Sequence, residues 1–232
     1  MRHHGGMRRW VPPVVVGGLL GWTVLVMPLS VGIGKYLAYY DPQSDAELLE
    51  YHRDVAAHVY TAGHWAGQLV AALAGVWLVR RAGEFRPATI TWAGFSGALL
   101  GLGTTAVAIA VGVPALLRRG YPIMVAEPSV WWCLAASVAC FPLWAVAGAA
   151  TAGVLHRRAV LAVVAAILCQ PATLLLTAGI AAPPSSHPVA VATIAGAGPA
   201  ALVMPAILLG WATTATVAAL LVTHRRRSQP AR

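Results

Sequence analysis

The feature that most constrains this chain is a series of long apolar runs, which continue almost without interruption from Thr89 to Leu117 and from Val130 to Ala182. A transmembrane helix needs about 20 mostly apolar residues to cross roughly 30 Å of hydrocarbon. The composition agrees, because 59% hydrophobic and 10% charged residues lie outside the usual range of a soluble globular domain. We therefore expect an all-α, polytopic helical bundle in a cell (inner) membrane.

The apolar runs predict six transmembrane helices within one domain that covers residues 1–232. The first run, from Val11 to Gly34, is longer than the core of a signal peptide, which has about 7 to 15 apolar residues, and it lacks a clear small-x-small cleavage site. We therefore expect it to remain as the first span. The six predicted spans, with limits set to within several residues, are 11–34, 60–79, 89–117, 129–155, 159–181 and 200–223.

Basic residues at the ends of the predicted spans indicate the orientation of the bundle. Of the 16 Lys and Arg residues, 12 fall on one side, and the positive-inside rule makes that side cytoplasmic. Both termini are then expected in the cytoplasm. The exceptions, in predicted outer loops, are Lys35, Arg53, Arg118 and Arg119. The 12 residues are Arg2, Arg8, Arg9, Arg80, Arg81, Arg86, Arg157, Arg158, Arg225, Arg226, Arg227 and Arg232.

The first predicted outer loop is acidic, and its second half is expected to be helical. Ser44 and Glu47 form a capping box, in which each residue caps a backbone amide of the other at the start of a helix. The second helix is therefore expected to begin outside the membrane. Besides Asp41, the acidic residues of this loop form a predicted outer polar cluster of Asp45, Glu47, Glu50 and Asp54.

Several functional classes are disfavoured by the sequence. The formal charge of +9 does not predict a nucleic-acid partner, because the basic residues flank helices in small groups rather than forming one stripe. The chain has no Gly-x-x-x-x-Gly-Lys-Ser/Thr phosphate loop, no Gly-x-Ser-x-Gly elbow and no His-Glu-x-x-His pair. No predicted span carries a mid-membrane acidic residue suited to a proton relay. We therefore expect a chain that is not an enzyme and does not itself hydrolyse ATP.

Histidine and cysteine are the residue types here that could hold a metal or haem. His52, His58 and His64 recur every six residues, which sets neighbours about 240° apart around a helix, so one helix cannot aim them at one metal. A shared site would need ligands from another helix. We expect no metal and no cofactor in this chain. The cysteines, expected to act as small apolar residues without a disulfide framework, are Cys133, Cys140 and Cys169.

Small residues one helical turn apart predict close packing between helices. Such Gly-x-x-x-Gly pairs let helix backbones approach, and they support packing within one chain at least as well as packing between two chains. The pairs are Gly17 with Gly21, Gly63 with Gly67, and Gly97 with Gly101.

A polar turn follows the second predicted span, which is apolar from Gly67 to Val79. The turn contains Gly83, Glu84, Phe85 and Arg86, followed by Thr89 and Ile90. This pattern resembles the ABC-2 type transporter permeases, in which the second span runs into a cytoplasmic Gly-Glu-aromatic-basic-x-x-Thr-Ile turn. The stretch from Leu143 to Ile167 is similar to that family's small-residue fourth span, basic turn and fifth span.

The resemblance implies the membrane subunit of an ABC-type exporter that moves an amphipathic or hydrophobic substrate. Such a subunit pairs with a second permease copy or paralogue and couples to a separate ABC ATPase, which binds the ATP. The residues of the coupling turn would be Gly83, Glu84, Phe85, Arg86, Thr89 and Ile90. Phe85 would be the anchor buried against the ATPase, and Glu84 and Arg86 the orienting charges.

Other interpretations stay open from the sequence. Glu84 is also consistent with a plain interfacial carboxylate paired with Arg80, Arg81 or Arg86. The chain as a whole is also consistent with a non-transporting accessory or assembly subunit. A third possibility is a small cofactor-binding bundle that uses His58 or His64.

Overall fold

The computed structural model describes residues 44–168 and 198–228, together with the single positions 18 and 21, and this part of the chain contains no strand. The expectation of an all-α chain is therefore confirmed for the described residues. The helices are α2 (Asp45–Tyr60), α3 (His64–Ala82), α4 (Pro87–Arg118), α5 (Pro128–Leu155), α6 (Ala159–Leu168) and α9 (Val203–Ser228), with short 3-10 helices η1 (His156–Arg158) and η2 (Gly198–Leu202).

Four helical stretches among the described residues are long and apolar enough to cross a membrane. They are Asp45–Ala82, Pro87–Arg118, Pro128–Leu168 and Pro199–Arg226. Each contains one of the predicted spans 60–79, 89–117, 129–155 and 200–223. Apart from positions 18 and 21, the predicted first span, 11–34, lies outside the described residues, as do positions 169–181 of the fifth.

The predicted second helix is interrupted in the structure. Ser44 caps the start of α2, where its Oγ accepts a hydrogen bond from the Glu47 amide at 3.3 Å, as the capping pattern predicts. At the other end, the Thr61 amide and hydroxyl donate to Ala57 O at 3.0 and 2.8 Å. Gly63 then takes a φ of +80°, which glycine adopts without steric cost, and α3 starts in a new direction. Two helices thus replace the single continuous helix expected there.

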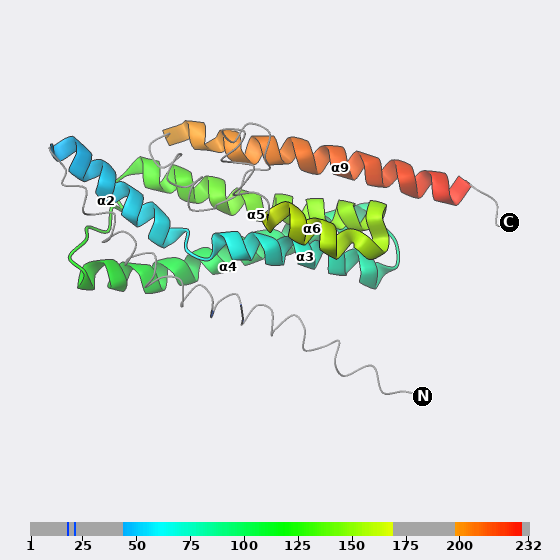
Figure 1. The fold of residues 1–232 in the computed structure, drawn as a ribbon, viewed down its shortest axis with the longest axis horizontal. Helices are drawn as coiled ribbons and strands as arrows, with labels where there is room; N and C mark the ends of the chain where they lie inside the picture. The colour runs from blue at the N-terminus through cyan, green and yellow to red at the C-terminus, as the bar shows by residue number, and fades with distance from the viewer. Residues whose placement is uncertain (1–17, 19–20, 22–43, 169–197, 229–232) are drawn as a thin grey trace, which may run out of the picture.

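Helix α5 lies at the centre of the described bundle and packs on α3, α4, α6 and α9 (Figure 1). Glycines allow its closest approaches. A Cβ at Gly75 would overlap the carbonyl oxygen of Ala145, and a Cβ at Gly148 would overlap that of Ala72. Helices α3 and α5 therefore meet backbone to backbone.

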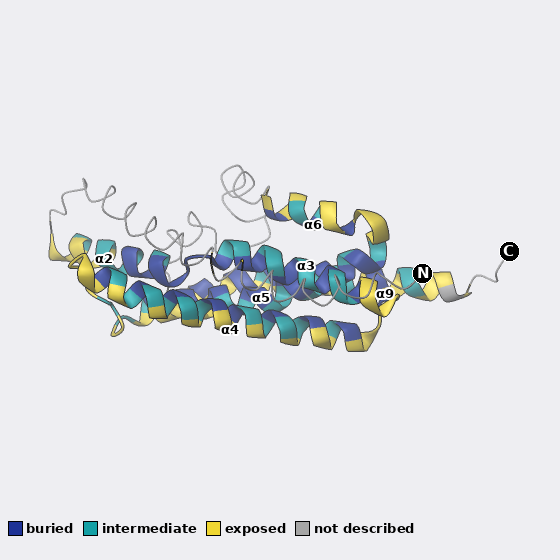
Figure 2. Cartoon of the chain, turned by 90° about the horizontal axis from the view of Figure 1, so that it is seen from below, coloured by how far each residue is buried: buried dark blue, intermediate teal, exposed yellow. Residues whose placement is uncertain are grey.

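Helix α4 shows a narrow buried stripe and a wide exposed face (Figure 2). Gly97 and Gly101 lie on the stripe, and a Cβ at either position would press on Phe141 of α5. This glycine pair therefore packs within the chain. The opposite face exposes large apolar side chains, as expected for contact with lipid: Trp92, Phe95, Leu99, Leu102 and Leu117.

Charges separate between the two ends of the bundle. The turns after α3 and α5 and the end of α9 lie together at one end, here called the basic end (Figure 1). Its cationic residues are Arg80, Arg81, Arg86, Arg157, Arg158, Arg225 and Arg226. The opposite end, here called the acidic end, carries Asp45, Glu47, Glu50, Asp54 and Glu127 together with Arg53, Arg118 and Arg119.

Candidate functional site

The turn between α3 and α4, residues 83–86, lies at the basic end and is shaped by its two flanking residues. Gly83 ends α3 with a φ of +78°, and its amide donates to Val79 O at 3.0 Å. Arg86 is extended, and Pro87 takes the first position of α4, where its missing N–H costs no helical hydrogen bond. The chain therefore reverses in a short, defined turn.

Phe85 is the structural centre of this turn. Its side chain is 3% exposed and belongs to the core of the bundle. A Cβ at Gly153 of α5 would lie 3.0 Å from Phe85 Cγ and 3.1 Å from Ala219 Cβ of α9, so three elements meet around the ring. Thr89 is also buried, and Ile90 packs against the same core. The expectation that Phe85 lies outside the packed bundle, as an anchor for another protein, is wrong, because this chain buries it.

The charged residues beside Phe85 remain accessible. Glu84 forms an ion pair with Arg86, and their side chains are 31% and 63% exposed. A pair of this exposure stabilises a fold little. Glu84 is thus paired with Arg86, one of the three partners that the alternative interpretation of the sequence named. The Arg86 side chain nevertheless remains exposed at the surface.

A second contact ties the turn to the end of α5. Arg80 Nη2 donates hydrogen bonds to the carbonyl oxygens of His156 and Arg157, at 3.4 and 3.3 Å. Arg81 instead lies over the ring of Trp77, with its Cζ 5.2 Å from the ring centre. The two connecting segments of the basic end, residues 83–86 and 156–158, are therefore joined through α3.

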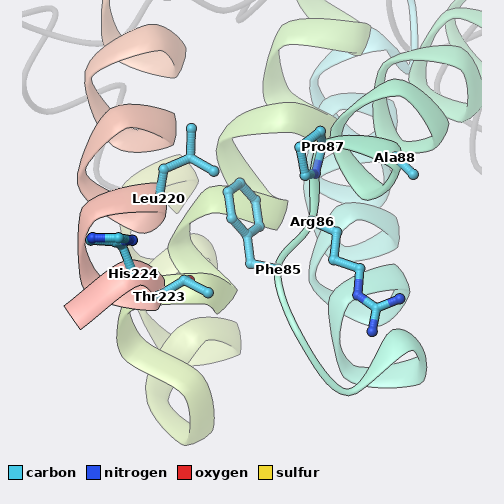
Figure 3. Close-up of a pocket in the computed structure, with 7 residues that line it drawn as sticks. All are labelled: Phe85, Arg86, Pro87, Ala88, Leu220, Thr223 and His224. Atoms are coloured by element: carbon cyan, nitrogen blue, oxygen red, sulfur yellow. The ribbon is translucent and has the colours of Figure 1, made fainter. Parts of the chain in front are cut away.

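A groove of about 710 Å³ opens beside the turn, between the start of α4 and the end of α9 (Figure 3). Phe85, Pro87, Ala88 and Leu220 form the apolar part of its lining, and Arg86, Thr223 and His224 form the polar part. The lining residues are Phe85, Arg86, Pro87, Ala88, Leu220, Thr223 and His224.

The residues of the outer polar cluster all lie on α2, and two of them contact other residues of that helix. Glu50 lies 3.5 Å from Arg53, one turn along the same helix. The main-chain oxygen of Asp54 is 2.8 Å from His58 Nδ1. Among the described residues, no group of three or more His, Cys, Asp or Glu side chains could hold a metal ion.

The three histidines lie in separate environments, with His52 and His58 on α2 and His64 on α3. The His52 ring packs edge-on at 6.2 Å from Tyr121. His64 is fully buried on α3, with Nε2 3.0 Å from Thr105 Oγ1 of α4. Gln68, one turn further along α3, and Ser137 of α5 are also fully buried. These buried polar residues inside the bundle were not predicted, although the spacing of His64 and Gln68 places both on one helix face.

Cys133 and Cys140 are buried on α5 as free thiols. Cys169 lies outside the described residues. Comparisons of the chain with protein-family models, with curated proteins and with solved structures return no match.

Proposed function

We propose that this chain is the membrane-spanning permease subunit of an ABC-type exporter, and that the turn at residues 83–86 receives movement from a separate ATPase. The observation that carries the proposal is the position of Phe85. Its ring is held between α5 and α9, while Glu84 and Arg86 on either side remain accessible. A partner that binds the two charged residues would therefore move a side chain that packs between α5 and α9.

Close packing makes this arrangement suited to transmitting force. Protein interiors have low compressibility, so a displaced Phe85 ring would also move the side chains packed against it. Phe85 contacts α5 and α9 directly, and Arg80 links the end of α3 to the segment 156–158. Displacement of the turn would thus reach α3 and α4, which it joins, and α5 and α9, which pack around Phe85, as a rigid-body or hinge movement.

The exposed residues define how the partner would bind. The proposed ATPase holds the ATP, and its docking surface would carry an acidic group for Arg86 and a basic group for Glu84. A second permease copy or paralogue would complete the transporter. The basic end would face the cytoplasm, in line with the positive-inside rule.

Capture of the partner tests this proposal. The full chain, tagged at its C-terminus, is extracted from its own cell membranes in mild detergent, and associated proteins are identified by mass spectrometry. We expect an ATPase subunit in amounts comparable to the chain. A Glu84→Arg variant should lose it, whereas Glu50→Arg, the same change at the acidic end, should retain it. An absence of any ATPase would instead support a non-transporting accessory subunit.

A further inference from the structure

His64 is the first residue of α3 and lies where the chain breaks between α2 and α3 (Figure 1). Its amide donates to Thr61 O at 3.0 Å, and Gly63 takes the left-handed conformation that turns the chain. The imidazole of His64 is fully buried in the bundle. A buried ionisable side chain inside a membrane-spanning bundle is costly to keep, so such residues commonly serve a function.

The contacts of the His64 ring suit its neutral form. Nε2 lies 3.0 Å from Thr105 Oγ1 of α4, and Phe141 of α5 stands edge-on to the ring, with the two ring centres 5.3 Å apart. Nδ1 is buried and has no hydrogen-bond partner in the described part of the chain. An imidazolium donates from both nitrogens, so protonation would bury a positive charge and leave one of its N–H groups unpaired.

The helices around His64 offer little negative charge to balance a proton on its ring. Helix α3 contains no carboxylate, and α4 contains no ionisable residue from Pro87 to Leu117. No salt bridge within residues 44–168 and 198–228 involves His64. Asp54 is the one carboxylate in the second half of α2, and it lies ten positions before His64, across the break. The ionisable groups of that half of α2 and of α5 are His52, Arg53, Asp54, His58, Tyr60, Cys133 and Cys140.

The position of His64 at the start of α3 adds to the cost of a positive charge. The helix dipole places about half a positive charge at the start of a helix, where the first backbone amides have no carbonyl partner within the helix. The first turn of α3 contains no acidic residue that would offset this potential. A protonated His64 would therefore be repelled by the helix that carries it, and the packed bundle accommodates the neutral ring.

We infer that His64 is an acid-sensitive switch at the junction between α2 and α3: when its ring takes a proton, the first turn of α3 separates from α4 and α5. A free imidazole titrates near pH 6.5, so below about that pH the open form gains a proton that the packed form excludes. The packed junction is therefore most stable above about pH 7 and loses stability as the pH falls. This switch depends neither on an ATPase nor on the turn at residues 83–86.

Hydrogen exchange measures this opening in the full chain. The protein is held in lipid nanodiscs at about pH 7.5 and about pH 5, on either side of the titration of a free imidazole. Mass spectrometry reads deuterium uptake in peptides covering residues 61–72, and each rate is divided by the intrinsic exchange rate at that pH. Because the open form alone binds the proton, its population should rise by about 30-fold at the lower pH. Peptides around Gly148, where α5 packs on α3, should change little. Equal protection of residues 61–72 at both pH values would overturn the inference.

Two variants identify the group that responds to acid. His64→Gln keeps a hydrogen-bonding side chain beside Thr105 but takes no proton, so the protection of residues 61–72 should not fall at the lower pH. The matched control, a His52→Gln, His58→Gln double variant, removes two half-buried imidazoles of α2 and should keep the full response. This control decides the assignment even where His64→Gln fails to fold. Loss of the response in the control, or its persistence in His64→Gln, would show that another group is the switch.

Discussion

Phe85 is the residue whose role changes most between sequence and structure. A single aromatic in a polar turn is consistent both with an anchor for a partner and with a core residue. The sequence does not distinguish them, because the choice depends on whether Gly153 and Ala219 leave space beside the turn. In the structure they do, and the ring fills that space.

We therefore expect Phe85→Ala to destabilise the protein. Removing a buried phenyl group leaves a cavity and costs about 3 kcal/mol or more. Thermal unfolding in detergent, followed by size-exclusion chromatography, measures the loss. Phe95→Ala removes the same ring from an exposed position on α4 and should change stability little. Equal melting of the two variants would show that Phe85 is not a core residue.

The polar residues inside the bundle show another limit of sequence reasoning at this scale. His64 is the last of three evenly spaced histidines, and it lies on α3, across the break at Gly63 from His52 and His58 on α2. Its hydrogen-bond partner, Thr105, lies 41 positions away on another helix. Only the packing of α3 on α4 brings the pair together, so no local pattern reveals it.

Helices were the most predictable elements of this chain. Four of the predicted spans coincide with α3, α4, α5 and α9, because runs of apolar residues long enough to cross a bilayer are hard to place elsewhere. The start of α2 was also predictable, since Ser44 caps it through a local hydrogen bond from the Glu47 amide. The break at Gly63 was not, because glycine is tolerated inside helices as well as between them.

The contact between α3 and α5 should be the least tolerant of added volume. Gly148→Val would push a side chain into the backbone of Ala72, which cannot move aside without shifting α3. Overpacking of this kind costs about 3 kcal/mol. Gly103→Val, at a helical glycine of α4 with nothing within 4 Å, is the matched control. The melting temperature should fall for Gly148→Val alone, and a fall of the same size in both variants would contradict the packing described.

At the scale of the whole molecule, the separation of charge between the two ends predicts how the chain sits in the membrane. Reporter fusions at the N-terminus, near Arg158 and after Arg227 should all indicate the cytoplasm. Fusions near Ser44 and Ser186 should indicate the outside. Each of these expected locations follows from the distribution of arginines, which favours a cytoplasmic position for the basic end. An outside signal near Arg158, or an inside signal near Ser186, would be incompatible with six spans.

The function of the whole molecule could be approached from the sequence only through the polar turn after α3. Its local chemistry was readable: a glycine ends one helix, a proline starts the next, and two charges flank an aromatic ring. The attachment of that ring to α5 and α9 was not readable, because it depends on contacts across more than 60 and more than 130 positions, counted from 85 to 153 and from 85 to 219. The proposed transmission of movement from the turn depends on this attachment.

The most direct test of the proposed coupling is the affinity of the ATPase for this chain in lipid nanodiscs, measured by titration with Glu84→Arg and Glu50→Arg in parallel. Glu84→Arg leaves the core intact and adds to the positive charge of the basic end, so folding and orientation should be kept. Loss of a central interface contact costs about 2 kcal/mol, which corresponds to roughly 30-fold weaker binding. We predict this loss for Glu84→Arg and none for Glu50→Arg. Equal affinity of both variants and the parent protein would contradict the claim that this turn receives the movement of the ATPase.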